Sequence, residues 1–381
     1  TFILNNFLRE TYNSRKLQIE QKIEKFLDKK IDLGDYSGIR LMGISLSNSK
    51  IIDKENENSE IKAKNIYVGI MPIRSFLKQK WIIKITPHQT EINVKKDFFK
   101  RENFYRNKKN ITKSKVDYDL NFNLNKYAIL KMSDLGVNTK VKGDLIYKSN
   151  NKEIIGKVKS KFEGRGILKL KLNAKLNQEI FKLDIFSNGV DIDGYKYNIN
   201  DREFEVKKGN FKSKFKFYKS SNKTYCKGKF SLNRLTLNTS DLSEDINSEE
   251  LSFFCKDNNL KANTENLNYG TLTSDFKLNI PLNKDLNNID IKGSIGYLNS
   301  LNPDIKLSAN IPYWVDRKGI NFGDINSSFD LNRTQLSNLN IFRSKGIRGF
   351  ITAKGVLKGK INDPDILINF NVDYPHYKGI R

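Results

Sequence analysis

The stretch "LKLKLNAKL" (168–176) alternates apolar and polar side chains, and three of its polar positions are lysines. Successive side chains of an extended strand point to opposite faces, so this spacing predicts a sheet with one apolar and one lysine-covered face. The stretch "FKSKFKFYK" (211–219) repeats the pattern with Phe in place of Leu. We therefore interpret the lysines as the solvated face of a half-buried sheet.

Strands of this kind continue along the chain from about residue 116. Short alternating segments are separated by Asn, Gly, Asp or Ser, and no segment of useful length has helical spacing there. The connections between the segments are short. Neighbouring strands are therefore expected to pair antiparallel, as a meander.

The first part of the chain has a different pattern. Residues 2–30 carry apolar side chains at helical spacing with Lys and Glu between them, which predicts a helix ending before Gly34. Further strands and one helical turn opened by Pro72 are predicted before a basic, poorly patterned stretch at 97–115. We divide the chain into a membrane-proximal helix, a β unit with a short helix, and an elongated antiparallel region (1–30, 31–115 and 116–381).

The composition favours a thin fold. The chain has 381 residues, of which 38% are hydrophobic, and its net charge is +25. The lysines are spread along strands and no nucleic-acid recognition motif accompanies them, so we expect no nucleic-acid partner beyond weak, non-specific and salt-dependent binding. Attraction to an anionic membrane surface is the better functional interpretation of the excess charge.

The polar side chains give no sign of catalysis. The two histidines, His88 and His376, lie in Pro-containing segments, and no cysteine or carboxylate stands at metal-ligand spacing. We expect no enzyme, no metal and no cofactor. For Cys226 and Cys255 we expect two unpaired, partly buried thiols, and a disulfide in an oxidising compartment is the alternative.

The apolar face of the predicted sheet has to be covered. A second sheet would make a β-sandwich, whereas a sheet curled on itself would make an apolar-lined groove suited to hydrocarbon, and the pattern favours the two equally. The expected fold is mainly β, with an N-terminal helix before an elongated antiparallel sheet. The candidate groove residues are Leu168, Leu170, Leu172, Phe181, Leu183, Phe211, Phe215, Phe217, Phe276, Leu278, Ile305, Leu307, Ile366, Ile368 and Phe370.

Both ends of the chain resemble the TamB/AsmA-like family of envelope proteins. At the N-terminal end, short strand motifs and a Pro-containing segment carry the resemblance, and at the other end a recurring strand pair does so. The matching residues are Ile31, Leu33, Gly34, Gly43, Ser45, Leu46, Ser49, Ile51, Val68, Ile70, Pro72, Leu77, Gly355, Leu357, Gly359, Ile361, Asp363 and Pro364. Between the two ends, the chain resembles the family only in its general strand pattern.

The resemblance implies a periplasmic bridge between membranes. It would be tethered to the inner membrane by an anchor preceding Thr1 and would carry phospholipid along its groove toward the outer membrane. The family is also linked to the assembly of outer-membrane β-barrel proteins, which implies an outer-membrane barrel of the Omp85 type as a partner. A scaffold that offers a sheet edge to client strands by β-augmentation is the alternative function.

Overall fold

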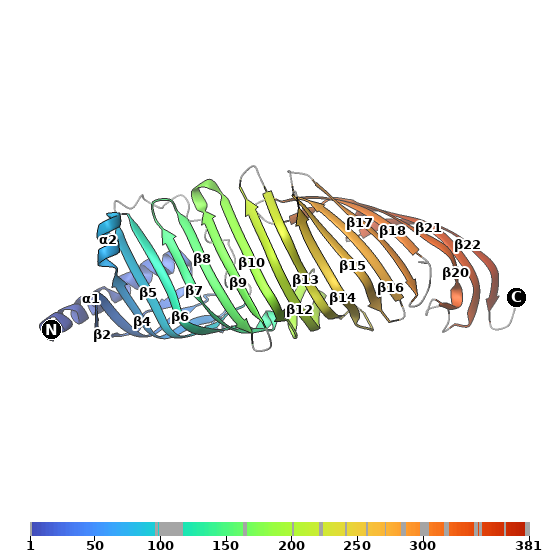
Figure 1. The fold of residues 1–381 in the computed structure, drawn as a ribbon. Helices are drawn as coiled ribbons and strands as arrows, with labels where there is room; N and C mark the ends of the chain where they lie inside the picture. Colours follow the sequence, from blue (N-terminus) through green and yellow to red (C-terminus); the bar gives the residue numbers. More distant parts are fainter. Residues whose placement is uncertain are drawn as a thin grey trace. The chain divides into compact units, whose positions relative to one another are not determined.

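The structure is a computed structural model of the chain (Figure 1). It divides into two compact units: unit 1 comprises Thr1–Glu205 with Lys219–Ser221, and unit 2 comprises Val206–Tyr218 with Asn222–Arg381. The residues described are 2–95, 98, 117–162, 166–199, 202–220, 224–240, 242–256, 258–270, 272–282, 287–297, 305–315, 320–338, 342, 345–361 and 363–377.

Unit 1 begins with the predicted helix, α1 (Phe2–Leu27), which is fixed to the chain that follows it. The Tyr12 hydroxyl donates a hydrogen bond to the Gly34 carbonyl at 2.7 Å, and the Glu24 carboxylate accepts one from the Ile31 backbone N–H at 2.9 Å. Burial, reinforced by the negative charge of nearby carboxylates such as Glu20, raises the pKa of Tyr12 to about 12. The phenol therefore stays protonated and keeps donating across the physiological pH range.

The rest of unit 1 is a sheet with one short helix. Each strand from β3 to β10 pairs antiparallel with the next, apart from one pair, and β1 and β2 both pair with β3. The elements are β1 (Lys30–Asp32), β2 (Tyr36–Arg40), β3 (Gly43–Ile52), β4 (Glu60–Ile70), α2 (Pro72–Lys78), β5 (Trp81–Asn93), β6 (Tyr118–Met132), η3 (Ser133–Leu135), β7 (Val137–Lys148), β8 (Glu153–Phe162), β9 (Ile167–Lys175), η4 (Leu176–Gln178), β10 (Ile180–Asp191) and β11 (Tyr195–Ile199).

The exception to the expected antiparallel meander is the pair β5–β6. These strands run parallel, with Trp81 opposite Tyr118 and Ile85 opposite Phe122. A parallel pair needs a connection long enough to return to the same end of the sheet, and residues 94–117 supply that length. The basic stretch predicted at 97–115 lies outside the described residues except for Phe98.

Unit 2 is built from antiparallel strands, as predicted. From β13 to β18 each strand pairs with the next, β18 pairs with both β19 and β20, and the series ends with β20–β21 and β21–β22. The strand β12 (Arg202–Lys219) contributes residues to both units. The other elements are β13 (Thr224–Thr239), β14 (Ile246–Lys256), β15 (Asn259–Tyr269), β16 (Leu272–Pro281), β17 (Asn287–Tyr297), β18 (Ile305–Val315), β19 (Ile320–Phe322), β20 (Ile325–Gln335), η5 (Leu336–Asn338), β21 (Ile347–Lys360) and β22 (Asp363–Tyr377).

The predicted fold class is confirmed: the protein is mainly β, and a long sheet follows an N-terminal helix. The segments predicted from the sequence (1–30, 31–115 and 116–381) do not coincide with the two compact units. The reason is the parallel pair, because β5 precedes residue 116 and β6 follows it. Strand pairing therefore joins the second and third predicted segments within unit 1.

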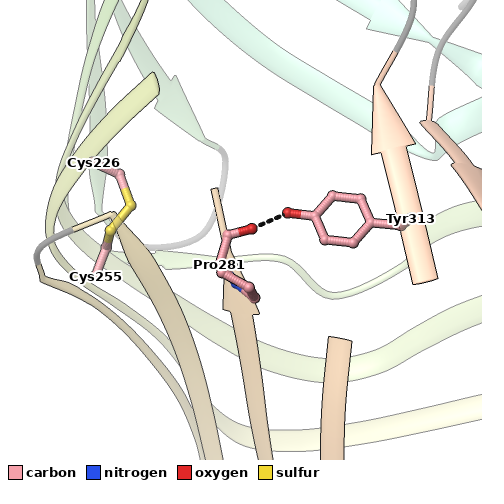
Figure 2. The surroundings of a disulfide bond; sticks show 4 residues. All are labelled: Cys226, Cys255, Pro281 and Tyr313. Carbon is pink, nitrogen blue, oxygen red and sulfur yellow. Dashed lines mark hydrogen bonds between the residues drawn. A yellow bond between two sulfur atoms is a disulfide. The ribbon is translucent and has the colours of Figure 1, made fainter. Parts of the chain in front are cut away.

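The expectation of two free thiols is wrong. Cys226 and Cys255 form a disulfide between β13 and β14, with their Cα atoms 5.7 Å apart (Figure 2). The two side chains are 0% and 1% exposed. Their spacing of 29 residues along the chain carries no pairing signal, but the β13–β14 register places Cys255 opposite Gly228, two residues from Cys226. The distance of 5.7 Å between the two Cα atoms is usual for a disulfide.

A buried ion pair at the start of β8 leads to a testable prediction of pH dependence. Glu153 is 6% exposed, and its carboxylate accepts hydrogen bonds from Lys148 Nζ at 2.7 Å and from Asn173 Nδ2 at 3.0 Å. The hydrogen bond from Lys148 is the largest cause that lowers the pKa of Glu153, against the opposing effect of burial. This stabilisation is present above the unfolded-state pKa and is lost as pH falls through the lower folded-state pKa.

We expect the substitution Glu153→Gln to lower the free energy of unfolding at pH 7 by about 1–3 kcal/mol, because the ionised acceptor is lost. Denaturant titrations at several pH values measure the effect, and the difference from the wild type should shrink once the pH is below about 4. The matched control is Glu203→Gln, which removes the exposed pair with Lys196 and should have a smaller effect. An effect of Glu153→Gln that does not change with pH would contradict this account.

Candidate functional site

One face of the unit 1 sheet carries apolar side chains in rows that cross the strands. Strand register places these residues opposite one another from β3 to β10. One complete row is Ile44, Val68, Ile85, Phe122, Leu145, Gly156, Leu172 and Leu183. The candidate residues Leu168, Leu170 and Phe181 lie on the same face, in adjacent rows. We call these rows the unit 1 apolar face.

The opposite face of the same strands is basic. Lys157 on β8 lies opposite Lys171 on β9, and Lys159 lies opposite Lys169. These lysines occupy the positions between the apolar residues of their strands, as the alternation predicts. The interpretation of the lysines as one face of a pleated sheet is therefore confirmed in β8 and β9.

Unit 2 has corresponding rows on one face of its own sheet, from β13 to β22. We call them the unit 2 apolar face. The first row is Phe230, Phe253, Ala262, Leu278, Ile291, Ala309, Ser327, Leu357 and Ile366. The second row is Leu232, Leu251, Thr264, Phe276, Gly293, Leu307, Phe329, Gly355 and Ile368. A third row holds Ile295, Ile305, Leu331, Ala353 and Phe370.

Aromatic rings pack together at the start of this face. The Phe215 and Phe230 rings meet edge to face with centroids 5.4 Å apart, and Phe230 stacks on Phe253 at 4.5 Å. The Phe211 and Phe230 centroids are 6.4 Å apart. The edge-to-face and stacked pairs have favourable aromatic geometry, so Phe215 of β12 packs directly on the first row and Phe211 lies near it.

Glycine occupies two positions of the second row where a neighbouring ring covers the backbone. A Cβ at Gly293 would lie 2.4 Å from the Phe276 ring, and one at Gly355 would lie 2.2 Å from the Phe329 ring. The glycines thus allow the two phenylalanines to lie flat across adjacent strands. This arrangement keeps the face level and continuous.

The substitution Gly355→Ala should displace the Phe329 ring and lower the free energy of unfolding by about 1–3 kcal/mol. Thermal or denaturant unfolding measures the change. The matched control is Gly156→Ala in unit 1, because a Cβ there would lie 3.4 Å from Leu145, an ordinary contact. Equal effects of the two substitutions would contradict the role assigned to the covered glycine.

The large side chains of the two apolar faces keep substantial contact with solvent. Of the fifteen residues predicted from the sequence, twelve are half-buried, three are exposed and none is buried. Phe370, at the end of the third row, is 68% exposed. The filled interior of a sandwich would bury such side chains almost completely, so their incomplete burial favours an uncovered face over a sandwich at these positions.

The structure groups the predicted residues in two sets. Leu168, Leu170, Leu172, Phe181 and Leu183 lie together in unit 1, and the other ten lie in unit 2. Sequence reasoning missed Phe230, Phe253 and Phe329 in unit 2, and most of the row from Ile44 to Leu145 in unit 1. Alternation within single strands could have found Phe230 and Phe329, but only the register shows which residues are neighbours.

An open hollow of about 1040 Å³ lies mainly on the polar face of unit 2, and its lining also includes Phe254 and two residues of the first row, Ala262 and Leu278. Its lining includes Lys229, Lys261, Lys277, Lys292 and Asp290, which occupy the outward positions of β13 to β17. The hollow therefore combines a charged rim with apolar lining residues.

Two further searches concern the described part of the chain only. No three side chains of the metal-ligating kinds come together there. Among the described helices, none is both long enough and apolar enough to cross a membrane. Comparisons of the chain with protein-family models, with curated proteins and with solved structures found no match.

Proposed function

We propose that the two apolar faces bind the acyl chains of phospholipid and that the protein carries lipid without enzymatic chemistry. The observation that carries the proposal is the incomplete burial of large apolar side chains that lie in register across many strands. Monomeric proteins rarely leave so much contiguous apolar surface in water unless it binds something. Rows made mostly of Leu, Ile, Phe, Val, Ala and Gly, with no charged residue in them, match the chemistry of a hydrocarbon chain.

The dimensions and energies are adequate for this task. At the usual spacing between strands, the unit 1 row from β3 to β10 extends about 34 Å. Each methylene group removed from water contributes about 0.8 kcal/mol. The free energy of shielding a whole 16-carbon acyl chain from water is therefore roughly 13 kcal/mol. A surface that shields the chain along its length lowers this barrier, and no reaction step is required.

The disulfide supports a location outside the reducing cytosol. Disulfides form and persist in oxidising compartments such as the bacterial periplasm. The Cys226–Cys255 bridge is buried against the sheet. Together with the resemblance to the TamB/AsmA-like family, it supports a periplasmic location, whereas the proposed tether to the inner membrane and the proposed outer-membrane barrel partner of the Omp85 type rest on the resemblance alone.

The strand β22 favours a second candidate function, strand addition to client proteins. It pairs with β21, and large apolar side chains of its two faces, such as Leu367 and Phe370, are 65% and 68% exposed. An exposed strand of this composition can pair with an extended segment of another chain. A scaffold for outer-membrane β-barrel assembly or protein translocation would use this property.

The test is to identify what the purified protein carries. We expect native mass spectrometry of the protein, prepared without detergent, to show co-purified phospholipid that organic extraction releases. A preparation that contains no lipid and takes up none from vesicles would contradict lipid carriage. Peptides or unfolded barrel strands bound in place of lipid would support the second candidate.

A further inference from the structure

Unit 1 carries a cluster of exposed apolar side chains apart from its apolar rows, at one end of its strands. The turn between β2 and β3 (residues 40–43), the helix α2 and the first residue of β5, Trp81, form it. We call this cluster the α2 tip. Figure 1 shows α2 at the end of β5.

Backbone hydrogen bonds hold the tip together. The Ile70 N–H donates to the Met42 carbonyl, and the Met71 N–H donates to the Ile82 carbonyl, both at 2.9 Å. The Ser75 hydroxyl oxygen accepts a hydrogen bond from the Ile82 N–H, also at 2.9 Å. The turn and the helix are therefore fixed to the same end of the sheet, while the rest of α2 faces away from it.

The side chains of the tip are among the most exposed apolar groups of the described chain. The exposed fractions are 87% for Leu41, 75% for Ile73, 85% for Phe76, 74% for Leu77 and 52% for Trp81. No residue of α2 is buried. Packing within the protein does not account for Ile, Phe and Leu on a short helix with so little contact, so an external partner is indicated.

The charges around the tip are mainly positive. No Asp or Glu occurs in residues 36–52 or 61–90. Arg74 and Lys78 of α2 form no ion pair within the described chain, and Arg40 contacts Ser45. Of the nearby acidic groups, Asp119 is buried and paired with Lys80 at 2.8 Å, and Asp117 lies next to the Trp81 backbone.

We propose that the α2 tip is a peripheral docking surface for an anionic lipid bilayer. The apolar side chains would enter the boundary between headgroups and acyl chains, with Trp81 at headgroup level and Arg40, Arg74 and Lys78 facing lipid phosphates. The proposal commits to a bilayer because the apolar groups project outward and the flanking charges are unpaired and positive. It does not depend on what the apolar faces carry.

Flotation with vesicles tests the proposal. The full chain should bind vesicles of phosphatidylcholine mixed with phosphatidylglycerol, bind pure phosphatidylcholine more weakly, and bind less as salt is raised. The triple variant Ile73→Ser, Phe76→Ser, Leu77→Ser should bind the mixed vesicles at least about tenfold more weakly. Its fold should be unaffected, because the three side chains are exposed.

The matched control changes strongly exposed residues outside the α2 tip and outside the named rows of the apolar faces: Tyr197→Ser on β11 with Leu367→Ser and Tyr374→Ser on β22 should leave vesicle binding within about twofold. The proposal is overturned if the wild type does not bind mixed vesicles, or if both triple variants behave alike. It is also overturned if the α2 variant changes self-association in solution, since the tip would then be a contact between copies.

A fluorescence measurement separates insertion from simple charge attraction. The chain has two tryptophans, so Trp81→Phe and Trp314→Phe give a silent background in which Phe76→Trp reports on α2 alone. Its emission should shift to the blue on binding mixed vesicles, and quenchers placed at shallow depth in the lipid should reduce it. Binding with no shift would overturn insertion. Lipid co-purification should be unchanged in the α2 triple variant, so failure of lipid carriage and failure of docking are distinguishable.

Discussion

Placing one carboxylate in each apolar face should abolish phospholipid carriage. In the double variant Leu170→Asp, Phe215→Asp, we expect the co-purified lipid measured by native mass spectrometry to fall by at least about tenfold. Leu170 lies between Val158 and Ile185 in its row, and Phe215 meets Phe230, so both changes put a charge where methylene groups would lie. Desolvating an unpaired carboxylate costs far more than the burial of a few methylene groups contributes.

The matched control makes the same change of charge on the opposite face of the same strands. Lys171→Gln and Lys216→Gln each lower the charge by one unit at exposed positions, and the bound lipid should stay near the wild-type amount. Far-ultraviolet circular dichroism shows whether the apolar-face variant keeps its sheet. If that variant folds and still carries lipid at the wild-type level, the apolar faces are not the binding surface.

Removal of the disulfide should have the second largest effect. For a sequence separation of 29 residues, cross-linking stabilises by about 3–4 kcal/mol through the unfolded state, and the variant Cys226→Ser, Cys255→Ser should lose this amount. Both cysteines belong to unit 2, so hydrogen exchange should accelerate in β13 and β14 while the strands of unit 1 stay protected.

Two comparisons make this test specific. The wild-type protein treated with a reductant should resemble the double-serine variant, because both lack the cross-link. Reductant should have no effect on the variant itself, since the chain has only two cysteines. Unchanged stability of the reduced wild type would contradict the stabilising role assigned to the bridge.

The sequence predicts the strands whose side chains alternate and largely predicts which residues share a face. In β9, Leu and Lys alternate from Leu168 to Leu172, and the two faces are as expected. In β14 the alternation is interrupted, because Phe253 and Phe254 are adjacent and break the period of two. Adjacent aromatic residues place one ring on each face, and Phe254 is 47% exposed on the polar side.

The features that depend on pairing could not be predicted. The parallel pair β5–β6 is a consequence of the long connection, and the rows from Ile44 to Leu183 exist only once every register is fixed. The disulfide has the same origin, because Cys226 and Cys255 become neighbours through the β13–β14 register. The alternation within a single strand predicts the face of the sheet on which a residue lies. Its neighbours on that face are determined by the pairing of strands that are distant in sequence.

Site-specific photo-crosslinking to phospholipid tests the central claim most directly. A photoreactive amino acid is placed at Leu172 or Leu278 on the apolar faces, or at the next positions on the polar faces, Lys171 or Lys277. Each pair lies on one strand at nearly the same place, so only the face differs. Lipid adducts at Leu172 and Leu278 but not at Lys171 and Lys277 are predicted, and equal labelling of both faces, or none on the apolar faces, would contradict lipid carriage there.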